Sequence, residues 1–316
     1  MKKIISLALT LLLGIGALQA QQEEHYTQFM YNKQMLNAGY VGSRDVPSLS
    51  GIYRNQWLGF DRAPVSQIVS FNSSVFGNRV GMGLSINHNT IGIQESFYGS
   101  LAYSYKIQIS PDAALRVGLQ ANVRYLGMDF RDQSVIAIDQ VGDDVIQAGQ
   151  AKLYNGNFGA GLYFSSKRAY AGVSIPHLLK NDIRLRANNI TNQNAEERRH
   201  VYVMTGASLP IGSKLFLEPN LLGKYVPGAP IDADANLTIN YNNFIKFGLS
   251  YRMGGDKIGD SVDGLIYIQA TKGLGIGAAY DYTLSQLNNY NKGSIEILAR
   301  YDFYKKGKDL TNPRLF

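Results

Sequence analysis

Apolar and polar side chains alternate along most of the chain. From 97 to 109 the odd positions carry Phe, Gly, Leu, Tyr, Tyr, Ile and Ile, whereas the even positions carry Tyr, Ser, Ala, Ser, Lys and Gln. Residues 115–125 and 231–241 repeat this alternation. A period of two residues is typical of a strand whose two faces meet different environments, and no helical stripe of comparable length follows residue 20. The pattern predicts an all-β protein.

Applied to the whole chain, the alternation and the turn residues between alternating runs predict fourteen strands. The first two are the least regular. The predicted strands lie at 48–58, 64–76, 78–88, 95–109, 114–130, 155–165, 168–177, 199–209, 213–226, 231–241, 244–253, 261–271, 274–284 and 293–304.

The connections between these strands differ systematically in length. Those after even-numbered strands are tight, such as Gly77 and Asn242-Asn243, whereas nearly all the long ones follow odd-numbered strands, including 131–154 and 178–198. Outer-membrane barrels have short periplasmic turns and longer extracellular loops. Closing the sheet also removes the unpaired edges that lipid would not tolerate. We therefore predict a closed antiparallel up-and-down transmembrane β-barrel in the outer membrane of a Gram-negative bacterium; a soluble secreted sandwich is the alternative fold.

A membrane barrel turns its apolar face to lipid, so the charged residues of its strands face the lumen. A charge on the lipid side would cost about 2–4 kcal/mol at the bilayer midplane. The alternation does not decide whether the lumen is open or plugged. The side chains predicted to face the lumen are Lys106, Arg116, Arg124, Asp232, Asp234, Lys246, Arg252, Glu296, Arg300 and Asp302.

The first twenty residues have the composition of a signal peptide. Lys2-Lys3 precede a continuous apolar stretch, and the chain becomes polar directly after Ala20. We predict cleavage after Ala20 or, because Leu18 is not small, a residue or two away; a retained membrane anchor is the alternative. The remaining divisions are an N-terminal periplasmic or lumen segment (21–47), the barrel (48–304) and a basic C-terminal tail (305–316).

Composition narrows the class of protein. The 316 residues have a mean hydropathy of −0.15, too polar for a bundle of transmembrane helices. The absence of Cys excludes disulfide scaffolds, thiolate metal sites, Cys nucleophiles and lipoprotein anchoring. A net charge of +7, part of it in the signal peptide, suits a protein beside anionic lipid. Together with the export signal, it predicts no nucleic-acid partner.

Candidate catalytic and metal-binding residues are sparse. The histidines are His25, His88, His177 and His200, and no two have the spacing of metal ligands. Outer-membrane hydrolases assemble their catalytic residues from separate strands, so such an enzyme stays open as an alternative without a local signature. We predict no enzymatic activity, no catalytic residue, no metal and no cofactor.

Two other motifs are better explained as structural. Asp143-Asp144 and the pair Asp232 and Asp234 lack the spacing and central Gly of a calcium loop. The glycines at 81, 83, 273, 275 and 277 are spaced by two inside predicted strands, with no helix after them, unlike a nucleotide-binding loop. We interpret them as small residues on a crowded lumen face.

Residues 25–43, HYTQFMYNKQMLNAGYVGS, are too irregular for a strand and too aromatic for a disordered leader. Together with the following blocks they resemble the start of the PorP/SprF family, outer-membrane proteins of the type IX secretion and gliding machinery. Ala38 and Gly39 depart from the family's Pro and Ala. Weaker similarities occur at 81–92 and 312–316. The matching positions, which are our candidates for partner docking, are Gln28, Phe29, Asn37, Tyr40, Gly42, Arg54, Gln56, Trp57, Gly59 and Pro64.

The resemblance implies a non-enzymatic barrel that supports export or surface attachment of cargo proteins such as adhesins through protein contacts. Its partners would be periplasmic or lipoprotein components of the secretion system, secreted adhesins, and outer-membrane lipid. The alternative is a passive porin for small solutes or lipids. We expect residues 21–47 and the basic tail to be exposed in the periplasm, and 131–154 and 178–198 to face outward.

The aromatic segment 29–40 also has two interpretations. We predict that it packs in the lumen or at its periplasmic mouth, where it narrows the pore and shapes a docking surface. Alternatively, it is a loose leader that becomes ordered only with a partner, as chain termini often are.

Overall fold

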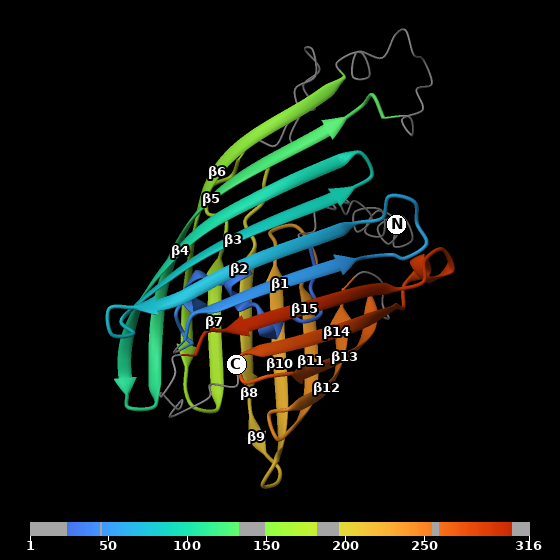
Figure 1. Ribbon diagram of the computed structural model, residues 1–316. Coiled ribbons are helices and arrows are strands. Elements are labelled where there is room, and N and C mark those ends of the chain that lie inside the picture. The colour runs from blue at the N-terminus through green and yellow to red at the C-terminus, as the bar shows by residue number, and fades with distance from the viewer. Residues whose placement is uncertain (1–23, 45, 133–148, 182–195, 255–258, 305–316) are drawn as a thin grey trace, which may run out of the picture.

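The computed structural model describes residues 24–44, 46–132, 149–181, 196–254 and 259–304. In these ranges the chain forms one sheet and a few 3₁₀ turns (Figure 1). Among the described residues, no helix is long and apolar enough to span a bilayer. The strands are β1 (Ser48–Asn55), β2 (Val65–Val75), β3 (Val80–Ile91), β4 (Gln94–Ser110), β5 (Ala113–Asp129), β6 (Gln150–Ser165), β7 (Ala169–Ile175), β8 (Val201–Ala207), β9 (Leu209–Pro210), β10 (Leu215–Tyr225), β11 (Asp232–Tyr241), β12 (Ile245–Met253), β13 (Ser261–Gln269), β14 (Leu274–Thr283) and β15 (Ser294–Asp302).

The sheet closes into a barrel in which neighbouring strands are antiparallel. The last strand, β15, pairs with the first, β1, with Ile52 opposite Leu298. Elsewhere in the wall, β10 pairs with both β8 and β11. The two-residue strand β9 continues β8 beyond Ser208 and also pairs with β10. If β8 and β9 are counted as one strand, fourteen strands form the wall of the barrel. This confirms the predicted closed barrel.

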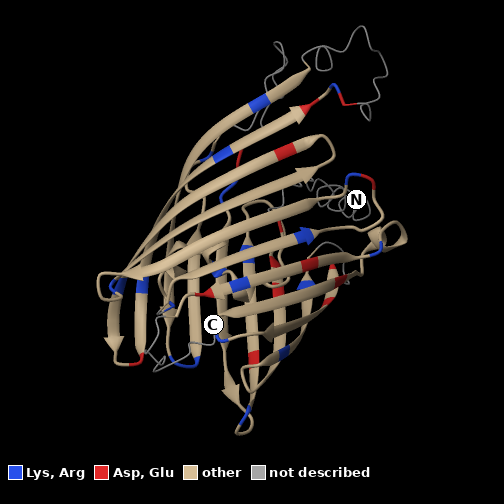
Figure 2. Ribbon diagram, viewed as in Figure 1, with Lys and Arg blue, Asp and Glu red and all other residues tan. Residues whose placement is uncertain are grey.

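The two ends of the barrel differ. At one end the connections are tight, for instance 76–79, 111–112 and 166–168, and this is the periplasmic end by the rule for outer-membrane barrels. At the other, extracellular end lie the longer connections 56–64, 130–149, 176–200 and 284–293. Several of the periplasmic turns contain Lys or Arg, shown in blue in Figure 2.

One extracellular connection is shorter than the predicted gap between strands. The strands β3 and β4 continue to Ile91 and from Gln94, and these two residues are paired. The turn between them contains Gly92 at φ 57°, a conformation that a glycine adopts without strain. The wall at β3–β6 therefore rises higher than elsewhere in Figure 1.

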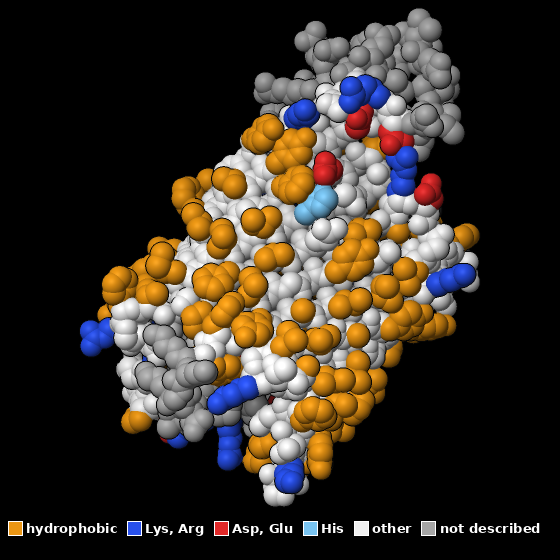
Figure 3. Space-filling view, in the orientation of Figure 1, with side chains coloured by type: hydrophobic (Ala, Val, Ile, Leu, Met, Phe, Trp, Pro, Cys, Tyr) orange, Lys and Arg blue, Asp and Glu red, His pale blue; other side chains and the backbone are white. Residues whose placement is uncertain are grey.

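The outer surface is an apolar band (Figure 3). Along β4 the outward residues include Phe97, Leu101 and Ile109, which are 42%, 64% and 59% exposed, whereas the inward Ser104 is fully buried. Twelve residues at about 3.4 Å each, tilted by about 45°, cover about 29 Å of membrane thickness, close to that of a hydrocarbon core. The apolar residues predicted to face lipid are thus the ones that point outward from the barrel.

Candidate functional site

The N-terminal segment fills the lumen. Residues 25–44, called the plug below, form the 3₁₀ turns η1 (Phe29–Tyr31), η2 (Lys33–Met35) and η3 (Ala38–Tyr40) inside the wall (Figure 1). All but Met35 are buried. Of the two predicted locations for the N-terminal segment, the described residues 25–44 occupy the lumen and are not exposed in the periplasm, because their aromatic side chains are buried there and their backbone is hydrogen-bonded to the wall.

The first residues of the plug are held by a charged cluster. The Glu296 carboxylate accepts hydrogen bonds from the backbone N–H groups of Thr27 and Gln28, each at 2.9 Å. The Thr27 hydroxyl donates to Asp281 at 2.6 Å. The guanidinium of Arg54 donates to Asp281 at 2.6 Å and to Glu296 at 3.3 Å, so both carboxylates are paired as well as hydrogen-bonded. Such charge-assisted hydrogen bonds are stronger than neutral ones.

His25 extends this cluster to the extracellular ends of β10 and β11. Its Nδ1 lies 2.6 Å from the Lys224 ammonium, which can only donate, so Nδ1 accepts and Nε2 carries the proton toward Asp232 at 3.3 Å. Burial, followed by the charge of Lys224, lowers the pKa of His25 well below its usual value. Lys224 and Arg252 both pair with Asp234, at 3.2 and 2.7 Å.

The last residues of the plug are held through backbone carbonyls and an amide side chain. Asn37 accepts from the Gly39 N–H at 2.8 Å and donates to the Leu162 carbonyl on β6 at 3.0 Å. The Ser174 hydroxyl on β7 donates to the Leu36 carbonyl at 2.7 Å. Similarly, Ser104 on β4 donates to the carbonyl of Val41. Three strands of the wall therefore bind the plug directly.

Glycines of the wall make room for this close approach. A Cβ at Gly118 would collide with the plug backbone at Ala38–Gly39, one at Gly81 with the Val41 carbonyl, and one at Gly161 with the Asn37 amide. A Cβ at Gly277 would likewise meet the Gln28 side chain. Gly81 and Gly277 thus face a crowded lumen, as interpreted from the sequence, and it is the plug that crowds them.

Lys33 lies fully buried in an aromatic cage. Its ammonium donates to the Met30 carbonyl at 2.7 Å and sits 4.2 Å from the ring centroid of Tyr170 and 5.6 Å from that of Tyr40. Contacts of this kind stabilise a cation that has lost its water. The rings of Tyr40 and Tyr163 then meet edge to face at 5.4 Å.

Part of the long loop between β7 and β8 turns into the extracellular mouth. The Pro176 carbonyl accepts from Asn122 at 2.9 Å, and Glu197 accepts from Asn157 at 3.0 Å and from Arg124 at 3.4 Å. His177 contacts the Tyr98 hydroxyl at 2.9 Å. The described parts of the predicted outward loop 178–198 thus lie against the rim, whereas most of 131–154 lies outside the described residues.

The predicted lumen charges occupy different levels of the lumen. Arg116, Asp234, Lys246 and Arg252 are buried, Lys246 pairs with Glu218 at 2.8 Å, and Arg300 lies 3.6 Å from Asp302. Asp232 is close to His25, and Arg124 to Glu197.

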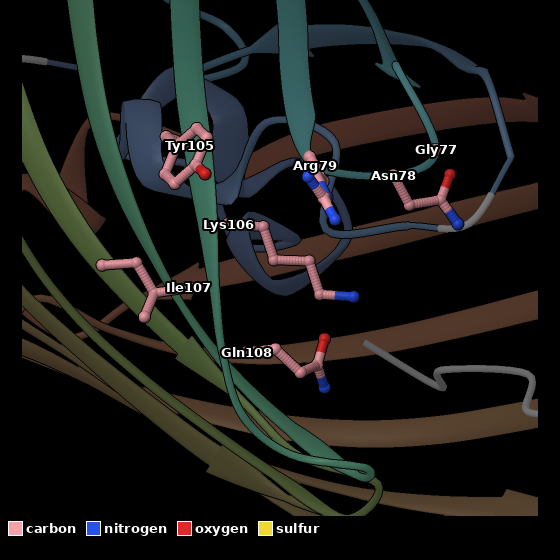
Figure 4. Close-up of a pocket in the computed structure, with 7 residues that line it drawn as sticks. All are labelled: Gly77, Asn78, Arg79, Tyr105, Lys106, Ile107 and Gln108. Atoms are coloured by element: carbon pink, nitrogen blue, oxygen red, sulfur yellow. The ribbon is translucent and has the colours of Figure 1, made fainter.

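Lys106 lies near the periplasmic end of β4. It lines a hollow of about 390 Å³ at the periplasmic end with Arg79 and Gln108 (Figure 4).

The family-motif residues form two groups. Gln28, Phe29, Asn37, Tyr40 and Gly42 belong to the plug, and Arg54 on β1 holds the carboxylates that bind its first residues. The other four lie in the connection after β1: Gln56, Trp57, Gly59 and Pro64. There the Gln56 N–H donates to the Pro64 carbonyl at 2.9 Å, and the Trp57 N–H donates to the Ser294 hydroxyl at 3.2 Å.

Several residues of the site were not singled out from the sequence. Asp281, Ser104, Ser174 and Glu197 lie far from the plug in sequence and bear no motif. The alternation of polar and apolar residues along β14 predicts that Asp281 faces the lumen. The neighbouring sequence does not indicate which residue it binds. Within the described residues, no three Asp, Glu or His side chains are grouped to hold a metal.

These features define the class: an outer-membrane β-barrel whose own N-terminal segment occupies its lumen. The family model "Type IX secretion system membrane protein PorP/SprF" matches residues 18–301. The chain therefore belongs to the PorP/SprF family, and it is an outer-membrane protein of the type IX secretion system.

Solved structures with a similar fold are outer-membrane barrels. The Ralstonia pickettii toluene transporter TbuX is 10% identical, with a TM-score of 0.54 over 86% of this chain and 93% of that one. The Pseudomonas putida toluene transporter TodX is 9% identical, with a TM-score of 0.50 over 86% and 93%. At these identities the likeness concerns the fold alone. No curated protein matches the sequence significantly.

Proposed function

We propose that the protein is a barrel component of the type IX apparatus that supports export or surface attachment of cargo proteins, adhesins among them, through protein contacts rather than through solute flux. The observation that carries the proposal is the occupied lumen. A segment with residues such as Gln28, Lys33 and Asn37 fully buried leaves little path for water-borne solutes.

The ends of the barrel are what such a protein offers to partners. In the described turns at the periplasmic end, the exposed charged side chains are mostly cationic, and Asp112 is paired with Lys167 at 2.6 Å. A basic rim attracts acidic protein surfaces and speeds their association. The exposed cations there are Arg79, Lys167, Arg168, Lys214 and Lys272.

The passive porin is the other candidate function, and it requires a measurable flux. We expect proteoliposomes with the intact protein to swell no faster than protein-free liposomes in small sugars. Rapid swelling would favour the porin.

The protein-contact function is tested by charge reversal at the periplasmic rim. In a strain that depends on this chain, the variant Lys167→Glu with Arg168→Glu and Lys272→Glu should lower surface-attached or secreted cargo at least tenfold. The matched control is Lys292→Glu, an exposed cation in the extracellular connection before β15, which should leave cargo unchanged. Affinity purification from the native membrane should recover secretion components with the control only. Equal cargo and equal partner recovery in both variants would contradict the proposal.

A further inference from the structure

The contacts at the two ends of the plug define the direction in which it runs through the barrel. His25 contacts Lys224 and Asp232, which lie at the extracellular ends of β10 and β11. At its other end, Arg44 pairs at 2.8 Å with Asp302, the last residue of β15 at the periplasmic end. The plug therefore descends from the extracellular end to the periplasmic end before β1 begins.

Intermediate contacts follow the same order. Thr27 is level with Asp281, two residues below the extracellular end of β14, and Asn32 contacts Ser70 in the middle of β2 at 3.2 Å. Val41 meets Ser104 in the periplasmic half of β4. Taken together, these contacts lead the segment from the extracellular end of the lumen to its periplasmic end.

The exposure of the first described residues marks where the chain enters. Glu24 is exposed, whereas His25 is 8% exposed and every residue from Tyr26 to Gln34 is buried. The point of entry is therefore at the extracellular rim.

From this path we propose that the mature amino terminus is presented on the cell-surface side of the outer membrane, while the carboxyl end of the barrel lies in the periplasm. With cleavage after Ala20, three residues precede Glu24, and at about 3.5 Å each they reach about 10 Å. That is too short to return across a membrane about 29 Å thick through a lumen that the plug already fills. The even number of membrane-crossing strands, taken alone, would have placed both ends of the chain in the periplasm.

This arrangement gives the barrel a chain end for partners on each side. The arrangement also requires the signal peptide to be removed before the plug is enclosed, because a retained anchor would have to follow it through the lumen.

The absence of Cys makes the topology directly testable. We would introduce Glu24→Cys, with Asn288→Cys in the extracellular connection before β15 and Ser213→Cys in the periplasmic turn before β10 as matched controls, all at exposed positions. Intact cells would be treated with a membrane-impermeant maleimide, and a second sample would be treated after permeabilisation.

Glu24→Cys should react in intact cells within about twofold of Asn288→Cys, whereas Ser213→Cys should react only after permeabilisation. If Glu24→Cys needs permeabilisation, or stays unreactive in both samples, the proposal is overturned. Gln22→Cys provides a second reporter, and heat-modifiable migration verifies that each variant is folded. Labelling does not depend on cargo export, so this proposal and the proposed function can fail separately.

Discussion

A single methyl group on the wall should displace the plug. In Gly118→Ala, on β5, the added Cβ meets the backbone of Ala38 and Gly39, which cannot move away as a flexible side chain could. The matched control is Gly264→Ala, on β13, where an added Cβ meets nothing within 4 Å. Both changes replace a strand glycine by alanine, which by itself stabilises a strand by about 0.5–1 kcal/mol because alanine loses less backbone entropy on folding. This contribution is the same in the two variants.

The expected effect follows from the collision. Overpacking costs about 1–3 kcal/mol, and a clash with backbone belongs at the upper end. If the clash is relieved only when the plug leaves the wall, the free energy of plug docking becomes about 3 kcal/mol less favourable than in the control. That is about a 150-fold larger population of barrels with an undocked plug.

Two measurements report on the plug. Planar-bilayer recordings of Gly118→Ala should show frequent open events that are rare in the control, and the amide protons of residues 28–41 should exchange faster. In a background lacking residues 25–43, Gly118→Ala should have no further effect on conductance. Equal behaviour of the two glycine variants, or the same effect without the plug, would refute the reasoning.

Three further predictions concern single residues. Because the pKa of His25 in the folded protein is lowered below its unfolded value of about 6.5, its contribution to plug docking is present above that pH and is lost as the pH falls below it, by up to about 1.4 kcal/mol per pH unit. Hydrogen exchange of the plug between pH 7.5 and 5 should accelerate in the wild type more than in His25→Gln, and equal slopes would contradict this assignment. Lys33→Met should keep the plug docked, because replacing a buried charge by a hydrophobic side chain is often neutral or stabilising, whereas Lys33→Glu should open the channel in the same recordings. Leu101→Arg, on the lipid face, should lower the free energy of unfolding in vesicles by about 2–4 kcal/mol, and Leu101→Ala should lower it by less; a smaller loss for the arginine would argue against a lipid-facing position.

The barrel could be predicted from the sequence because its causes are local. Each strand must satisfy lipid on one face and the lumen on the other, so residues such as Leu101 and Ser104 reveal their faces by their parity alone. Turn residues sit beside the strands they connect. The hairpin at Gly92 was missed as a tight turn because polar residues at strand ends resemble those of a loop.

The site was less accessible to sequence reasoning. The segment 29–40 could be recognised as unusual from its aromatic and irregular composition, and Arg54 from its motif. The partners of these residues could not be found in this way. Glu296 is more than 260 residues from Thr27, and the two meet only because the closed barrel brings β15 around its lumen.

By itself, the sequence determined the alternation, the sorting of short turns and long loops, and hence a closed barrel with charges inside. The tertiary structure decided what occupies that interior and in which direction the plug runs. The physical reason is that alternation records only whether a side chain meets lipid or lumen. The fit between the plug and glycines such as Gly118 depends on distances across the closed barrel, which no local pattern encodes.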